Sequence, residues 1–468
     1  FDPFRFELGR FRSTDPEIAL RLSGVLAAEP EGWHLSLDGS LDRGTREGIL
    51  AYWPTGLMAK PRKWVVDNVH SARLSDAIFA LRLDPGGTPR SYLDMRMEEV
   101  DLTYARTLPQ ITGGSGQLTI NQDRLIVNAD GGQIVPPEGG ALDIAGSQFV
   151  IPNTRERPAQ GEVTINARAP LVAALSFLDS PKLEVMQKAG KPVQLGEGEV
   201  EVTGRLVLPL KKGVKRHEMQ LSARGIARSV SSAELVPGRR LGAERLDITV
   251  DDAGVEVAGQ VDVSGIPFDG TWRQSFTPGA GSRVEGTVAL SESSARAMGL
   301  ALPAGTVSGQ GKGQIGIDLA RGAPPRFVLT SDLAGLGLAL PQIGWRLSPR
   351  STGSFEISGA LGRPVTIDRI ALNAAGLKAD GTVELDGSGA FKTLRLPDLS
   401  VGTWLDTAAT LTGRGRAQAP AIVLSGGRLD MRSAPFGTSP KAGATSNGTG
   451  AASAGGGPIT VSLDRLQV

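Results

Sequence analysis

Cysteine is absent from the 468 residues of this chain, and aromatic residues make up only 5% of it. Without cysteine, neither a disulfide framework nor a thiolate metal site can form. A cysteine-free chain is compatible with the cytosol and with an exported compartment alike. The low aromatic content argues against a set of compact enzyme domains that pack around aromatic-rich cores.

An excess of one charge and a long apolar run are also missing. The 50 basic and 49 acidic residues give a net charge of +1 with the two signs interspersed, which argues against nucleic acid as a partner. No apolar run reaches the roughly 18 to 20 residues that span a bilayer, and no signal peptide begins the chain. Because the sequence starts with Phe1-Asp2-Pro3-Phe4 and not with methionine, we expect it to be a region of a longer protein.

Residues for metal binding or catalysis are sparse. His34, His70 and His217 stand alone, outside the spacings of a metal site. No G-x-S-x-G motif occurs, and the carboxylates occupy the polar positions of expected strands. We therefore expect no metal, no cofactor and no enzymatic activity. A sugar-cleaving pair of carboxylates stays open as an alternative, because its two partners meet only in space.

What the chain does contain is apolar residues at every second position. Leu246, Ile248 and Val250 alternate with polar residues, and Val255 with Val257 resumes the alternation after a turn. A period of two over many short runs separated by turns predicts antiparallel strands with one apolar and one polar face.

A short phrase of this kind recurs along the chain, namely glycine, any residue, apolar, any residue, apolar. Its uneven spacing indicates a loose strand-building unit and not a strict solenoid repeat. The copies are Gly116 to Ile120, Gly161 to Ile165, Gly198 to Val202, Gly259 to Val263, Gly286 to Leu290, Gly313 to Ile317, Gly353 to Ile357 and Gly381 to Leu385.

Three short segments favour helix: Pro61 to Val69, Pro170 to Leu178 and Ser291 to Met298. Trp64 and the basic residues of the first segment are compatible with a membrane-surface contact. We favour a helix that caps the end of a sheet, because the segment is so short.

The domain organisation follows from the same patterns. Alternation over residues 1–433 predicts one elongated β region, with residues 150–200 and 290–305 as the places for any subdivision. Residues 434–458 are rich in Gly, Ala, Ser and Thr, which predicts a flexible loop. Residues 459–468 begin a further strand. The fold class is mainly β, with roughly 20 to 25 strands. Three arrangements of their apolar faces stay open: they close on each other as sandwiches, they close as a barrel, or they line a long trough.

Three groups of residues resemble the YhdP branch of the AsmA-like superfamily, and the resemblance covers roughly residues 15 to 400. The most specific group is Tyr52-Trp53-Pro54-Thr55-Gly56-Leu57, followed by Pro61 to Val65 and Asn68. The others are the helix at Pro170 to Leu178 with Leu206 to Leu210, and Asp332 to Leu336 with Leu340-Pro341. The resemblance implies a long, twisted antiparallel sheet curled into a U-shaped groove in the bacterial periplasm. It also implies an inner-membrane anchor in an N-terminal segment that is missing from this chain. The function implied by the resemblance is carriage of phospholipid between inner and outer membranes.

The glycine phrases then predict which side chains line the groove. Acyl chains of phospholipids would lie against the apolar register of the phrases, with headgroups in water, at Val200, Val202, Val261, Val263, Val288, Leu290, Ile315, Ile317, Phe355, Ile357, Val383 and Leu385. The alternative is a structural or assembly scaffold of the cell envelope, with other envelope proteins as partners and a β core closed on itself.

Overall fold

The computed structural model describes residues 4–56, 58–277, 279–297, 305–340, 343–362, 365–387, 390–415, 418, 420–434 and 458–467. Strands make up 61% and helices 9% of it, and 26 strands belong to one large mixed sheet. This confirms the mainly β fold with few short helices. The chain divides into two compact units, Phe1–Val255 and Glu256–Val468, so the boundary lies outside both stretches expected for a subdivision. The expected flexible loop at 434–458 lies, except for its first and last residues, outside the described residues.

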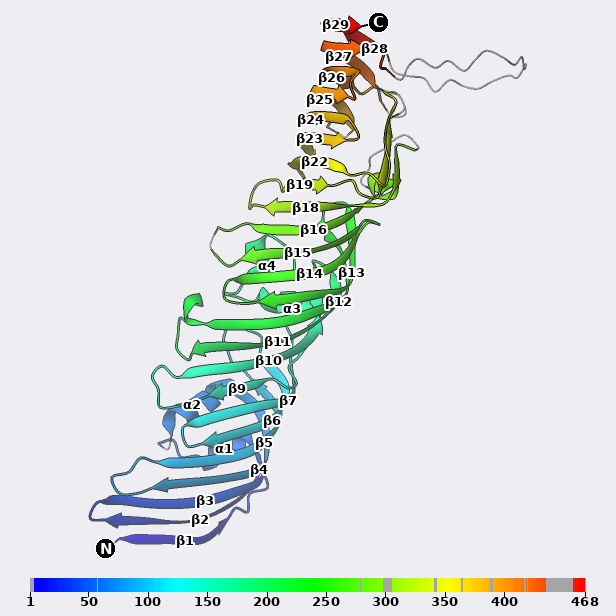
Figure 1. Cartoon of the computed structure of the whole chain (residues 1–468). Coiled ribbons are helices and arrows are strands. Elements are labelled where there is room, and N and C mark those ends of the chain that lie inside the picture. The colour runs from blue at the N-terminus through cyan, green and yellow to red at the C-terminus, as the bar shows by residue number, and fades with distance from the viewer. Residues whose placement is uncertain are drawn as a thin grey trace. The chain divides into compact units, whose positions relative to one another are not determined.

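The first unit consists of strands joined mostly by hairpins, with helices inserted after β3 and β10 (Figure 1). Its elements are β1 (Arg5–Arg12), β2 (Ile18–Glu29), β3 (Gly32–Thr45), α1 (Arg46–Tyr52), α2 (Ala59–Asn68), β4 (Val69–Leu83), β5 (Arg90–Leu102), β6 (Ile111–Asn121), β7 (Arg124–Ile134), β8 (Leu142–Asp143), β9 (Gln148–Ile151), β10 (Gln160–Pro170), α3 (Leu171–Leu178), α4 (Val185–Ala189), β11 (Glu197–Pro209), the 3-10 turn η1 (Arg216–Glu218), β12 (Gln220–Val236) and β13 (Arg239–Val250). From β1 to β7 each strand pairs antiparallel with the next. The ladder continues from β7 through β9 to β13.

Bulges interrupt neighbouring strands of this unit and bend them. Asp76 in β4, Glu99 in β5 and Ser229 in β12 have φ of 51°, 50° and 51°, in the left-handed region. The pairing register shifts at or beside each of them. A residue other than glycine costs roughly 1–2 kcal/mol in this conformation. Because a bulge bends and twists its strand, bulges in neighbouring strands curl the sheet.

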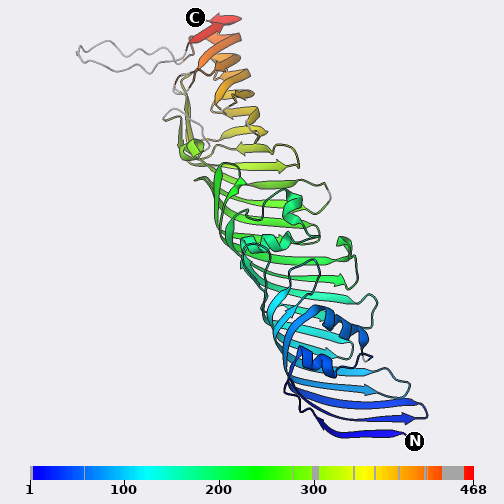
Figure 2. The same cartoon turned by 180° about the vertical axis from the view of Figure 1, so that it is seen from behind.

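The helices of the first unit lie on one face of the sheet (Figure 2). Ile49 of α1 packs against a buried cluster of Ile18, Leu41 and Ala77, so α1 covers the apolar face there. Helix α2 contacts β4, and Arg62 Nε donates to the Trp53 carbonyl at 2.9 Å, which ties α2 to the end of α1. Helix α3 contacts β10 and β11.

The predicted helices at 61–69 and 170–178 correspond to α2 and α3, whereas α1 was missed. The sequence predicts no helix before Pro61, but α1 begins at Arg46. The signal was Thr45, whose hydroxyl caps the helix by accepting from the Gly48 amide at 3.1 Å.

The second unit begins within β14 and is almost entirely strands. Its elements are β14 (Gly254–Val263), β15 (Pro267–Ser275), β16 (Ser282–Leu290), α5 (Glu292–Ala297), β17 (Val307–Gly309), β18 (Gly311–Leu319), β19 (Arg326–Ser331), β20 (Leu336–Leu340), β21 (Trp345–Leu347), β22 (Gly353–Ala360), β23 (Thr366–Ala374), β24 (Leu377–Leu385), β25 (Phe391–Val401), β26 (Leu405–Thr412), β27 (Ala421–Asp430), β28 (Ile459–Ser462) and β29 (Arg465–Gln467). Strands β15, β16, β18, β19 and β22 to β27 pair antiparallel in that order. Strands β28 and β29 both pair parallel to β27.

A separate sheet of three short strands, β17, β20 and β21, belongs to the second unit, with β20 in the middle. Its side chains Leu336, Trp345 and Leu347 are buried together with main-sheet residues such as Leu377 and Leu405. We call this sheet the cover. The sequence did not lead us to expect it.

Glycine in the recurring phrase has a structural reason at Gly286. Gly286 pairs with Gly270, and the Phe268 ring lies over both. A Cβ on Gly286 would stand 2.4 Å from the Asp269 carbonyl oxygen and 2.7 Å from a ring carbon of Phe268. The glycine pair therefore makes room for an aromatic ring on the sheet surface.

We expect Gly286→Ala to lower the free energy of unfolding by about 1–3 kcal/mol, because the methyl group collides with backbone atoms. Gly316→Ala, in β18 next to the residue that pairs with Gly286, is the matched control, since its Cβ would meet only the flexible Arg283 guanidinium at 3.1 Å. It should be neutral or slightly stabilising. Urea unfolding of the two variants measures the difference, and equal stabilities would contradict this account of the glycine.

Candidate functional site

In the first unit, apolar side chains meet directly across successive strands and form continuous rows. Because paired residues share a face, each row lies on one side of the sheet, which we call the apolar face. One row crosses β1 to β9 through Phe11, Leu22, Gly39, Phe79, Leu93, Ile120, Leu125 and Ile151. A second crosses β5 to β12 through Met95, Leu118, Val127, Phe149, Val163, Leu206 and Leu221.

The second unit has a row of the same kind. It crosses β15 to β28 through Trp272, Val284, Ile317, Phe327, Gly359, Ile367, Val383, Leu394, Leu411, Ile422 and Ile459. All are partly buried except Gly359, which is buried, and Ile459, which is 61% exposed. The side chains in the row shield one another from water in part, but they stay accessible to solvent.

The opposite side of the sheet is covered by ion pairs. In the second unit Arg283 pairs with Glu285 at 2.6 Å and also with Asp318, while Arg369 pairs with Asp380 at 2.7 Å. The Arg369 guanidinium lowers the pKa of the Asp380 carboxyl through its hydrogen bond and its charge. In the first unit Arg228 and Glu201 form the same kind of pair at 3.0 Å, and the pKa of Glu201 is lowered for the same reasons. Exposed pairs of this kind contribute roughly 0–1 kcal/mol each, so their effect is to keep this face in water.

The structure places eight of the twelve predicted lining residues on the apolar face of the second unit. Cross-strand pairing puts Val288, Leu290, Ile315, Ile317, Phe355, Ile357, Val383 and Leu385 on the same side. Five of these eight come together around Ile266 and Leu329, namely Val288, Leu290, Ile315, Phe355 and Ile357. Val288 is only 9% exposed, so it belongs to a packed cluster more than to an accessible surface.

The other four predicted residues lie in β11 and β14. Val202 pairs with Ala167 and Gly225 on the apolar face of the first unit, and Val200, two positions earlier, is only 5% exposed. Val261 and Val263 stand two apart near the end of β14 and so share a face, and both are partly buried.

Sequence reasoning missed much of the face. Phe268, Trp272 and Leu329 of the second unit were not among the predicted lining residues, and neither were the rows of β1 to β9. The alternation of apolar residues marks all of them, but we selected residues only from glycine phrases. The cover carried a weaker signal, the alternating Leu336, Leu338 and Leu340 next to Trp345.

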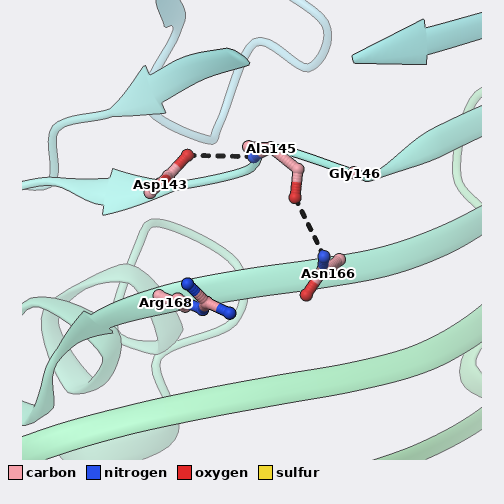
Figure 3. Close-up of a pocket in the computed structure, with 5 residues that line it drawn as sticks. All are labelled: Asp143, Ala145, Gly146, Asn166 and Arg168. Carbon is pink, nitrogen blue, oxygen red and sulfur yellow. Dashed lines mark hydrogen bonds between the residues drawn. The ribbon is translucent and has the colours of Figure 1, made fainter. Parts of the chain in front are cut away.

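Two polar features of the described residues bear on a metal or a small ligand. These residues contain no group of three His, Asp or Glu side chains that could hold a metal ion. A depression of about 290 Å³ in the first unit is lined by Asp143, Ala145, Gly146, Asn166 and Arg168 (Figure 3). Asn166 Nδ2 already donates to the Ala145 carbonyl at 3.0 Å, and Asp143 Oδ1 accepts from the Ala145 amide at 2.9 Å. Arg168 adds an exposed guanidinium, whose Nε lies 3.6 Å from a carboxylate oxygen of Glu201.

Within the described part of the chain, no helix has the length and apolar character that crossing a membrane requires. No family model, curated protein or solved structure matches the chain. The apolar face is therefore identified as the candidate site from its geometry alone.

We expect cysteine reactivity to separate accessible from covered parts of this face, because the chain has no cysteine of its own. Val284→Cys lies in the partly buried row, and Val401→Cys replaces a side chain that is 4% exposed within the cluster beneath the cover. A maleimide should modify the folded Val401→Cys variant at least about tenfold more slowly, since modification requires local opening. Equal rates would show that the cover does not protect the face.

Proposed function

We propose that the apolar face carries the acyl chains of phospholipids, which slide along it with their headgroups in water. The observation that supports this is the continuity of the apolar rows, which pass from strand to strand without a charged side chain. The resemblance to the YhdP branch supplies the biological setting of the proposal. The setting is the bacterial periplasm, between inner and outer membranes, with an anchor in the inner membrane.

The energetic argument concerns exposure of methylene groups. Each methylene removed from water is worth about 0.8 kcal/mol, so two acyl chains with some 30 methylenes would cost on the order of 20 kcal/mol to expose fully. A row of aliphatic side chains lowers this cost at every position along it. Because adjacent positions of the row are chemically alike, a lipid can shift from one to the next without a large difference in free energy.

The rival function is a structural or assembly scaffold of the envelope, and one observation favours it. In the second unit the cover buries part of the apolar face, so that Leu377, Val401 and Leu405 are 2%, 4% and 3% exposed. A face closed in this way stabilises the fold without a ligand. Lipid content separates the two functions, because several phospholipids per purified chain in native mass spectrometry support carriage and none supports the scaffold.

Ile317→Asp tests lipid carriage at a single position of the row. A carboxylate there must stay desolvated or draw water into the acyl path, so we expect lipid transfer between vesicles to fall by about tenfold or more. Ile317 is partly buried, and circular dichroism should show that the variant keeps its strands. Val288 suits the test less well, because it is buried against Ile266 and Leu329.

Val328→Asp is the matched control. It introduces the same charge in place of a β-branched side chain, in β19, next to the residue that pairs with Ile317. Val328 lies on the opposite face and is 47% exposed, so this variant should transfer lipid like the native protein. If Ile317→Asp folds and transfers lipid as fast as Val328→Asp, the proposal fails. If Ile317→Asp unfolds, the face is a closed core and the scaffold function is favoured.

A further inference from the structure

The cover conceals a part of the apolar face that continues the accessible row. Along β24, Leu377, Ala379, Gly381 and Val383 alternate on one side of the sheet, so the buried and the accessible ends of the strand share one face. Leu377 pairs with Val401, Val401 with Leu405 and Leu405 with Leu429. Leu377, Val401 and Leu405 are buried, and the row is chemically the same as the row of Val383, Leu394 and Leu411.

The cover supplies the groups that fill this part of the face. Leu336, Trp345 and Leu347 of the cover, with Leu333 from the turn before β20, are 3 to 5% exposed. They belong to one buried cluster with Ala374, Leu396, Leu399 and Ala409. These are aliphatic side chains and one indole, in the place where acyl chains would lie if the accessible surface continued. The cover thus shields from water the same apolar surface that a lipid would shield.

The attachment of the cover differs from that of the main strands. Among the described residues, β17, β20 and β21 pair only with one another, and they are three, five and three residues long. Lifting them breaks no backbone pairing of the main sheet. Only three residue pairs join β17 to β20 and three join β20 to β21, so the position of the cover depends largely on the side chains beneath it.

One polar contact fixes the cover near Trp345. The indole Nε1 donates to the carbonyl oxygens of Ala374 at 3.2 Å and Ala375 at 3.1 Å, where β23 turns into β24. Ala375 has φ of 46°, in the left-handed region, and the turn there presents both carbonyls to the indole. Trp345 therefore joins the cover to the main sheet through a hydrogen bond as well as through its ring.

We propose that the cover is displaceable and that the face beneath it is a second, concealed binding site for acyl chains. Acyl chains and the cover compete for Leu377, Val401, Leu405 and the side chains around them. A lipid that reaches this part of the second unit replaces the apolar contacts of the cover, so that neither surface is left facing water. This inference rests on the proposed lipid carriage and adds that the site is gated by the chain itself.

The test uses the native protein with vesicles of phosphatidylethanolamine and phosphatidylglycerol that contain phosphatidylethanolamine with a diazirine in one acyl chain. After photolysis, peptide mass spectrometry locates the labelled residues. Label is expected on the accessible row, at Val284, Ile317 and Val383, and at a lower level on the covered residues Leu377, Val401 and Leu405. Hydrogen exchange of the amides of Leu336–Leu340 and Trp345–Leu347 should become faster when lipid is bound.

Trp345→Phe keeps an aromatic ring and removes the indole donor. Labelling of Leu377, Val401 and Leu405 should rise by roughly fivefold, the shift in population that loss of one hydrogen bond produces. Trp64→Phe, on α2 in the first unit and 50% exposed, is the matched control and should leave this labelling unchanged. Label on the accessible row with none at Leu377, Val401 and Leu405, in the native protein and in Trp345→Phe alike, would overturn the inference and leave lipid carriage standing. Absence of label from the accessible row would overturn lipid carriage itself.

Discussion

Alternation with a period of two, kept in register across many strands, is the constraint on which the rest of this structure depends. A slip of one residue in any pair would move an apolar set to the charged side and an arginine to the apolar side. The pairs Val284 with Ile317 and Ile317 with Phe327 show the register maintained on one face. Arg283 beside Asp318 shows it on the other. A slip in register is therefore unfavourable on both faces, because it exposes apolar side chains on one and brings charged side chains to the other. Single exposed ion pairs contribute little stability.

Local chemistry then shapes the sheet that this constraint assembles. Bulges at residues such as Asp76 and Glu99 bend strands that would otherwise stay straight, and their left-handed conformations persist because the ladders on both sides hold them. Glycine has a different function at Gly39 and Gly286, where the rings of Phe79 and Phe268 occupy the space that a Cβ would need. Each of these rings therefore covers the position of a glycine as well as its own, in a chain with few aromatic residues.

Much of the fold could be predicted from the sequence, because period-two patterning and helix signals are local. The strand-rich architecture and the helices α2 and α3 follow from residues close together in the chain. Helix α1 was missed because its seven residues carry little periodicity and depend on one cap, at Thr45. The cover was missed for another reason. Its burial against Leu377 and Leu405 joins segments 30 to 70 residues apart, which no local pattern encodes. Eight of the twelve predicted lining residues follow the apolar alternation of the second unit, but the sequence did not show that Val200 and Val288 would be buried.

The same aliphatic side chains can form a protein core or a lipid-bearing surface, and what lies above them decides which. Ile317 and Leu377 lie on one face of one sheet, yet the first is partly buried and the second is 2% exposed. Since the hydrophobic effect is non-directional and scales with area, an acyl chain and the side chains of Leu336 and Trp345 stabilise such a surface in the same way. A sheet built with a continuous apolar face therefore needs no specialised residues to change from closed to lipid-bearing. It needs a cover whose removal leaves the main ladders intact, and in the second unit the separate pairing of β17, β20 and β21 meets that requirement.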